Sequence, residues 1–251
     1  MDVADRDRAF VRVAGPDAQD YLQRMVSNDV EALPVGGSCP ALLLTAKARV
    51  IAPLVVWRRG EEDFLLLTEP ELGDVVHGHL TRMRLRAQCE IEAEQHHAQL
   101  VFGGTGITSE VPDAVEVLDG GLEPTLSAEE LELLRIEASA PRWGAEIDDR
   151  ILPAEAGLDK THISFSKGCY PGQEPVARLH FRGHPNRGLR VLELNGMPPE
   201  EAELLHEGRP VGRVTSAARR PDGSVVALAY VRTEVPEDAR LDVAQLEART
   251  S

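Results

Sequence analysis

The stretch with the clearest potential for chemistry is residues 166–174, which read Ser-Lys-Gly-Cys-Tyr-Pro-Gly-Gln-Glu. It places one thiol, Cys169, between two glycines and two positions after Lys167. Pro171 and Gly172 supply the fixed negative φ and the positive φ that a type II turn requires. Because glycine lets the backbone approach a ligand closely, we expect Cys169 to lie at a bend outside regular secondary structure.

A cysteine reacts or binds metal as the thiolate, which a nearby cation or a helix N-terminus favours over the thiol. Lys167 is the candidate cation. Residues 172–182 are the candidate helix, since Pro175 suits a first turn. The alternative is a structural residue, because a lone cysteine often packs as a small hydrophobic side chain. The residues alone leave both interpretations open.

The composition is that of an ordinary soluble globular protein, with 251 residues, 42% hydrophobic and 27% charged. This length suits one large domain or two modest ones. The formal charge of −15 disfavours a direct electrostatic grip on nucleic acid or on an anionic membrane. A local basic patch is still conceivable at Arg178, Arg182, Arg187 and Arg190.

The cysteine spacing and the lack of a signal peptide limit the class of protein further. The three cysteines, at positions 39, 89 and 169, show no Cys-x-x-Cys pattern, so we expect neither a disulfide framework nor a cysteine zinc site. The charged N-terminus lacks the apolar core of a signal peptide. The most apolar region, 41–57, is interrupted by Lys47, Arg49 and Pro53 and cannot span a bilayer. We therefore expect a cytoplasmic protein without a membrane partner.

Both helices and strands are expected in the part of the chain that precedes the motif. A strand is expected at 10–13, then a helix in which Ala18, Tyr21, Leu22 and Met25 recur at helical spacing. Asn28 and Asp29 end that helix, as turn formers or as a polar site. Further strands are expected at 40–45, 50–57 and 64–68, buried on both faces, and at 85–91 and 99–102.

Two more helices and an acidic turn complete this part. The helix at 72–83 is expected to bury a stripe formed by Leu72, Val75, Val76, His79, Leu80 and Met83. Residues 109–125 are expected to be irregular, and a capping box predicts a helix start at Ser127. Glu146, Asp148 and Asp149 are expected to form a solvated turn.

The C-terminal part of the chain is expected to consist of strands. Strands expected at 211–216, 225–231 and 241–246, with turns such as Asp222-Gly223 and no helix between them, predict a small antiparallel barrel over 185–251. We place the boundary near 183–188. Residues 1–184 would then be an α+β region, with 1–100 and 101–184 as candidate subdomains.

The chain resembles the YgfZ-type folate-binding proteins, relatives of the glycine-cleavage T-protein (aminomethyltransferase). The resemblance covers nearly the whole chain and is most specific in the Lys-Gly-Cys-Tyr-x-Gly-Gln-Glu signature that begins at Lys167. The other markers occur in the family's order. They are Asp17-Ala18 with Tyr21-Leu22-Gln23, Asn28-Asp29-Val30, Arg135-Ile136-Glu137-Ala138, Pro153 with Glu155-Ala156-Gly157-Leu158, Val176-Ala177-Arg178, and Val211-Gly212 with Thr215-Ser216.

The resemblance implies an α+β, T-protein-like fold in which three layered segments surround a central hole that accepts a tetrahydrofolate or a polyglutamylated derivative. It also implies a protein that keeps iron–sulfur client enzymes active, including those that modify tRNA. We expect the protein to be a monomer. Lys167 and Cys169 are the residues that the resemblance ties to activity. Tyr170, Gly172, Gln173 and Glu174 complete the matched signature.

One departure separates the chain from the aminomethyltransferase branch. Those enzymes carry an aspartate for folate-dependent one-carbon transfer in the strand that corresponds to 48–57, whereas residues 48–54 read Ala-Arg-Val-Ile-Ala-Pro-Leu. Neither alanine nor proline can replace an acid that polarises a C–N bond. We therefore do not expect aminomethyl transfer.

Physical chemistry suggests how a folate would be held. The donor edge of a reduced pterin pairs with a carboxylate or amide, for which Glu155, Gln173 and Glu174 are candidates. The polyglutamate tail requires a cation, for which Arg135 and Arg178 are candidates. Each of these is alternatively an ordinary polar residue.

The leading hypothesis is a folate-binding accessory protein for iron–sulfur proteins, in which Cys169 is a thiolate or transient ligand and Lys167 stabilises its charge. One cysteine cannot hold a cluster that ordinarily takes four ligands, so a partner or small thiol would share it. The second hypothesis is a folate-dependent aminomethyl or one-carbon transferase that uses an acid such as Asp29. The third is an interaction module whose pocket binds nothing.

Overall fold

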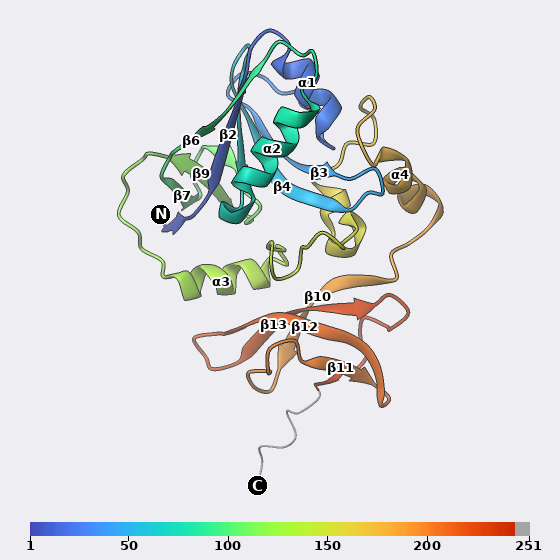
Figure 1. Cartoon of the computed structure of the whole chain (residues 1–251). Coiled ribbons are helices and arrows are strands. Elements are labelled where there is room, and N and C mark those ends of the chain that lie inside the picture. The colour runs from blue at the N-terminus through green and yellow to red at the C-terminus, as the bar shows by residue number, and fades with distance from the viewer. Residues whose placement is uncertain (244–251) are drawn as a thin grey trace.

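Three antiparallel sheets and four α-helices make up residues 1–243, the part of the chain that the computed structural model describes (Figure 1). The strands are β1 (Val3–Arg6), β2 (Ala9–Ala14), β3 (Ser38–Leu44), β4 (Val50–Gly60), β5 (Asp63–Thr68), β6 (Glu90–Glu94), β7 (Ala98–Phe102), β8 (Ile107–Thr108), β9 (Ala114–Leu118), β10 (Arg187–Leu194), β11 (Glu203–His206), β12 (Arg209–Arg219), β13 (Val225–Arg232) and β14 (Asp242–Val243). The α-helices are α1 (Ala18–Met25), α2 (Gly73–Met83), α3 (Ala128–Glu137) and α4 (Gln173–Arg182), and the 3₁₀ helices are η1 (Pro70–Leu72), η2 (Pro153–Ala156) and η3 (Leu158–Lys160).

Sheet I, with strand order β3-β4-β5-β2-β6, carries apolar side chains on both faces. Leu43, Leu54 and Leu66 share one core with α1 and α2. On the other face, Leu65 and Leu67 pack toward sheet II, while Leu42 and Leu44 pack toward the segment that contains Tyr170. The prediction that these strands are buried on both faces is confirmed.

Helices α1 and α2, which both pack on sheet I, are also joined by a hydrogen bond. The hydroxyl of Tyr21 on α1 donates to the carbonyl of Leu80 on α2 at 2.6 Å. The predicted stripe of α2 is wrong at its margins, because Val75 and Met83 are 45% and 42% exposed. Only Leu72, Val76 and Leu80 reach the core, since the stripe that faces the sheet is narrower than the apolar pattern.

Sheet II, with order β1-β7-β9-β8, lies beside sheet I. Its β9 falls in 109–125, so the prediction of an irregular connection there is wrong. The proline and glycine residues on both sides of β9 favour an irregular segment, and the alternating apolar pattern of the strand itself is short. The strand predicted at 85–91 is also shifted, since Leu85 is 87% exposed with φ +50° and pairing begins only at Glu90. Cys89 is buried in the core of sheet I.

Sheet III, with order β10-β13-β12-β11-β14, lies below α3 in Figure 1. Ile136 of α3 packs on Val226 and Leu228 of β13, while Leu131, Leu134 and Ala138 are only half-buried. The antiparallel arrangement is confirmed, but no pairing within residues 185–243 joins β10 to β14, so a closed barrel stays a prediction. The predicted strand 241–246 is seen as β14, and its remainder lies outside the described residues.

Glu146 joins α3 to sheet III. It is 1% exposed, and its carboxylate accepts hydrogen bonds from Arg135 Nη1 at 2.9 Å and from the hydroxyls of Thr215 and Ser216 at 2.7 and 2.6 Å. The Tyr230 hydroxyl donates to its carbonyl at 2.7 Å. The prediction of a solvated turn is therefore wrong at Glu146, because its partners come from distant strands.

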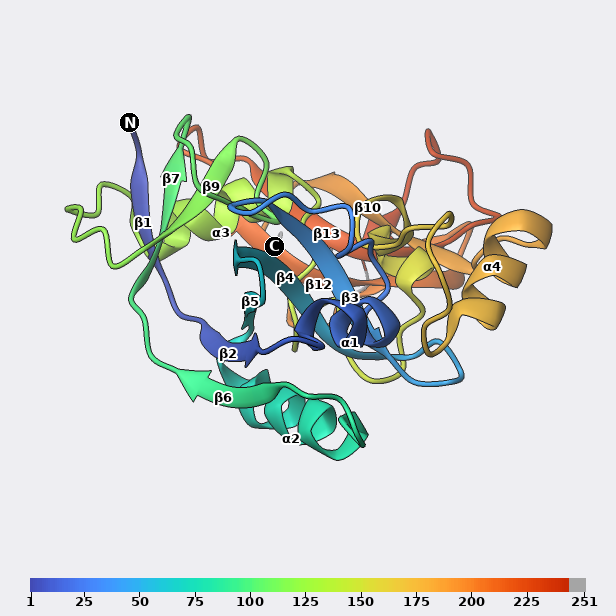
Figure 2. The same cartoon turned by 90° about the horizontal axis from the view of Figure 1, so that it is seen from above.

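Helix α4 and the N-terminal strand lie far apart in the molecule. Seen from above, α4 lies at the opposite end of the molecule from β1, β7 and β9 (Figure 2). Among residues 1–243, no helix has both the length and the apolar character required to cross a bilayer. The domain boundary at 183–188 coincides with the loop from α4 to β10 and stays a prediction.

Replacing Glu146 by Ala should lower the free energy of unfolding by about 3 kcal/mol or more, because Arg135 would be left buried without its fully buried partner. Urea denaturation monitored by circular dichroism measures this change. Asp149→Ala, at an exposed position three residues further on, is the matched control and should change stability by less than about 0.5 kcal/mol. Equal changes in unfolding free energy for the two substitutions would contradict the structural role given to Glu146.

Candidate functional site

Cys169 is exposed, whereas its neighbours Lys167 and Tyr170 are 9% and 7% exposed. The thiol lies in an irregular segment just before the turn Tyr170-Pro171-Gly172-Gln173. That turn has the predicted type II geometry, with Gly172 at φ 83° and ψ 0° and a hydrogen bond from Gln173 N to Tyr170 O. The structure therefore excludes a Cys169 that is buried as a small hydrophobic side chain.

Gly172 packs directly against the turn between β3 and β4. A Cβ atom there would lie 2.6 Å from the Thr45 carbonyl oxygen, so no larger residue fits without a shift of backbone. Helix α4 begins at the next residue, as predicted, with Pro175 in its first turn. The motif thus fixes the direction of the chain on the C-terminal side of the thiol.

Lys167 fixes the N-terminal side. Its ammonium donates to the carbonyls of Gln23 at 2.7 Å, Val26 at 2.8 Å and Asn28 at 2.6 Å, at the C-terminal end of α1. Burial lowers the pKa of Lys167 to about 8, although Asp29 opposes the shift, so the side chain is still protonated at neutral pH. These three bonds use all three of its donor hydrogens, and none is left for a thiolate.

Asn28 and Asp29 belong to the same junction. The Asn28 amide donates to the carbonyls of Pro40 at 2.6 Å and Thr161 at 3.1 Å. Oδ1 of Asp29 accepts from Gln23 Nε2 at 3.0 Å and from the Ala32 backbone. The structure therefore brings Asn28 and Asp29 together with Lys167, where they connect α1 to β3 and to residues 161–167.

The other predicted folate contacts lie apart from one another. On α4, Arg178 is exposed and pairs with Glu174 at 2.6 Å, one turn before it. Glu155 in η2 accepts from Arg187 Nε at 3.0 Å. Arg135 pairs with Glu132 at 2.7 Å and with Glu146 at 2.9 Å, and it lines the first of the cavities described next. These pairings also offset much of the charge of the basic patch that the sequence suggested.

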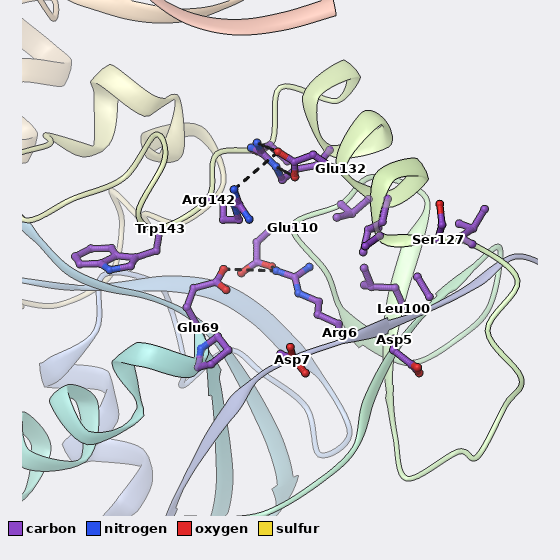
Figure 3. A pocket seen from close by; sticks show the side chains of 18 of the residues that line it. Asp5, Arg6, Asp7, Glu69, Leu100, Glu110, Ser127, Glu132, Arg142 and Trp143 are labelled. Atoms are coloured by element: carbon purple, nitrogen blue, oxygen red, sulfur yellow. Dashed lines mark hydrogen bonds and ion pairs between the residues drawn. The ribbon is translucent and has the colours of Figure 1, made fainter. Parts of the chain in front are cut away.

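The first cavity, of about 570 Å³, lies between β1, α3 and residues 140–143 (Figure 3). Arg6 Nη2 on its wall lies 2.9 Å from Glu110 Oε2 and 3.7 Å from Glu69 Oε1. Arg8, behind the wall, contacts Glu110 at 2.6 Å. Although burial opposes ionisation, Arg8 and Arg6 hold the pKa of Glu110 well below its usual range, so that it is a carboxylate at neutral pH.

The second cavity, also of about 570 Å³, lies between parts of all three sheets: β3 at Pro40, residues 108–112 after β8, and β10 at Gly188. Residues 138–141 and 154–162 complete its wall. It shares Glu110, Ala140 and Pro141 with the first cavity, so the two meet there. Volumes of this order are typical of small-molecule sites. Neither Cys169 nor Lys167 lines either cavity.

Besides Glu110, the second cavity is lined by Glu155, Lys160 and His162, of which the most deeply buried is His162. It is 4% exposed, its Nδ1 lies 2.8 Å from Thr161 Oγ1, and its Nε2 has no partner among the described residues. Sequence reasoning missed both His162 and Glu110. His162 follows no recognisable spacing, and Glu110 lies in the region that was predicted to be irregular.

The two other thiols differ from Cys169. Burial raises the pKa of Cys39 to about 12, although Lys167 opposes the shift, and burial also raises the pKa of Cys89. Within residues 1–243, no group of three His, Cys, Asp or Glu side chains is arranged to hold a metal ion.

Comparison with known proteins assigns the family. Residues 7–120 match the model of the GCVT N-terminal domain. The tRNA-modifying protein YgfZ of Serratia proteamaculans is 30% identical, over 94% of this chain and 86% of that protein. The chain belongs to the YgfZ family. This confirms the resemblance seen in the signature around Cys169.

More distant matches to this YgfZ-family chain include a mitochondrial relative and a solved structure. The mitochondrial iron–sulfur cluster assembly factor IBA57 homolog of Neurospora crassa is 23% identical, over 93% of this chain and 70% of that protein. The crystal structure of the glycine cleavage system aminomethyltransferase T from Bartonella henselae superposes with a TM-score of 0.80 at 19% identity, covering 92% of this chain and 78% of that one. The T-protein-like fold is thereby confirmed.

The burial of the thiols predicts their reactivity. In the native protein at pH 7.5, Ellman's reagent should modify one thiol rapidly, because Cys169 is exposed while Cys89 is 5% exposed and the Cys39 thiol is hard to ionise. Absorbance at 412 nm follows the reaction. Cys169→Ser should remove the fast phase, and all three thiols of the wild-type protein should react in denaturant. A fast phase that survives in Cys169→Ser would refute the prediction.

Proposed function

We propose that this YgfZ-family protein is a tetrahydrofolate-binding accessory protein that supports the assembly or repair of iron–sulfur enzymes, including tRNA-modifying ones. Cys169 is its functional thiol. The observation that carries the proposal is the exposure of Cys169 on a loop whose flanking side chains are buried. The names of two relatives support it, since one is a tRNA-modifying protein and the other an iron–sulfur cluster assembly factor.

The thiol has a limited role in this proposal. A thiolate suits iron–sulfur chemistry, but a cluster ordinarily takes four ligands. Cys169 therefore acts as a shared or transient ligand, completed by a client protein or a small thiol. Lys167 contributes by holding the loop on α1, because its ammonium is bound to three carbonyls.

The two joined cavities provide the folate site. Glu110, a carboxylate at the junction of the cavities, would pair with the donor edge of the pterin, and the free nitrogen of His162 offers a second polar contact. Among residues 1–243 this nitrogen is a buried polar atom without a partner, which favours a bound molecule over an empty pocket. A bound tetrahydrofolate would supply a reduced pterin and a carrier of one-carbon groups.

The transferase alternative has less support. Oδ1 of Asp29, the acid that it would need, is occupied by Gln23 and the Ala32 backbone, and the residue lines neither cavity. Strand β4 carries no carboxylate between residues 50 and 57. The interaction-module alternative predicts that the cavities bind no folate at all.

Titration calorimetry should detect binding of tetrahydrofolate to the wild-type protein. At a free ligand concentration of about 100 times Kd, the ligand should raise the free energy of unfolding by about 2.7 kcal/mol, because it binds only the folded state. p-Aminobenzoylglutamate, which lacks the pterin, is the control and should bind much more weakly. No heat and no thermal stabilisation would favour the interaction module.

The thiol is tested in a bacterial strain that lacks its own YgfZ. The wild-type gene should restore methylthio-modified tRNA, whereas Cys169→Ala should lose most of the rescue at unchanged protein level and melting temperature. Ser166→Ala, at an exposed position of the same loop, is the matched control and should rescue fully. Full rescue by Cys169→Ala would remove the thiol from the mechanism, and no rescue by the wild type would count against the iron–sulfur role.

A further inference from the structure

The backbone of His162 is fixed on both sides in the wall of the second cavity. Its amide donates to the Leu158 carbonyl at 2.9 Å, and its carbonyl accepts from the Ser27 hydroxyl at 2.6 Å. The same hydroxyl accepts from the Leu42 amide at 2.9 Å, so the segment is tied to β3. The position of the imidazole is therefore set by the fold before any ligand arrives.

The imidazole is left with one free nitrogen. Nδ1 is engaged with Thr161 Oγ1, while Nε2 has no partner among the described residues although the residue is 4% exposed. Buried polar side-chain atoms in native proteins are nearly always hydrogen-bonded. His162 lines the second cavity, so a molecule bound there can supply the partner that Nε2 lacks.

The charge state of His162 limits which kinds of molecule it can bind. Burial lowers the pKa of His162 to about 4, with Glu110 opposing the shift, so the ring is neutral at physiological pH. A hydroxyl can either donate to Nδ1 or accept from it, and the Thr161 contact therefore permits both tautomers. Nε2 can accordingly serve as donor or acceptor to a neutral, polar heterocycle, and it offers no positive charge to an anion.

We propose that His162 hydrogen-bonds the reduced pterin of the folate in the second cavity and thereby sets its position beside Glu110. This inference rests on the proposed function and names a positioning residue for it. The pterin ring presents donors and acceptors on its edge, which a neutral imidazole and a carboxylate recognise together. The negatively charged glutamate tail does not contact His162.

The experiment compares two ligands on three variants by titration calorimetry. His162→Phe keeps an aromatic ring without a hydrogen-bonding nitrogen, and it should raise Kd about tenfold because the pterin loses a buried partner. The increase should be the same for tetrahydrofolate and for 6-methyltetrahydropterin, which lacks the tail. His162→Gln restores a polar group and should bind with intermediate affinity. His184→Phe, at an exposed position outside both cavities, should not change Kd.

The outcomes separate this inference from the proposed function. Unchanged Kd in both His162 variants, with folate bound by the wild type, overturns the inference and leaves the proposed function standing. A loss seen with tetrahydrofolate but not with the pterin assigns His162 to the tail and also overturns it. No binding by the wild type overturns both. The ligand-free melting temperature of each variant shows whether it has folded, and His162→Gln provides the comparison if His162→Phe has not.

Discussion

The buried ammonium of Lys167 is the contact on which the exposed thiol depends. A lysine that is 9% exposed loses most of its hydration, and this cost is offset only while all three N–H groups have acceptors. The three carbonyls at the end of α1 meet that need, and the negative end of the helix dipole adds to it. The loop cannot leave α1 without stranding a buried cation, so Cys169, two residues on, is held at the surface.

Buried charged side chains also fix neighbouring segments to each other elsewhere in the molecule. Glu146 holds α3 and sheet III together through Arg135 and two hydroxyls, and Arg8 holds β1 and β2 to β9 through Glu116. Such pairs are costly to break because one charge is then left without its partner.

Local patterns in the sequence predicted local structure well. The helical spacing of Tyr21 and Leu22, the capping box at Ser127 and the type II turn at Gly172 all depend on residues within one turn of each other, and all three are confirmed. The partners of Lys167 and Glu146 depend on the fold as a whole. Lys167 binds carbonyls 139 to 144 positions earlier, and Glu146 binds hydroxyls 69 and 70 positions later. No local periodicity records such pairings, which is why Lys167 was expected to face the thiol and Glu146 to face solvent.

The thiol and the cavity are separate sites on one short segment. His162 lines the second cavity and Lys167 anchors the loop, and between them the Ser164 amide donates to the carbonyl of Ser27 at 3.0 Å. Residues 162 to 167 are therefore bonded to the end of α1 along their length. A ligand held by His162 would be bonded to the segment whose anchoring sets the position of Cys169. The two sites need no direct contact to influence each other, because any displacement of that segment would strain its bonds to Ser27 and to the three carbonyls.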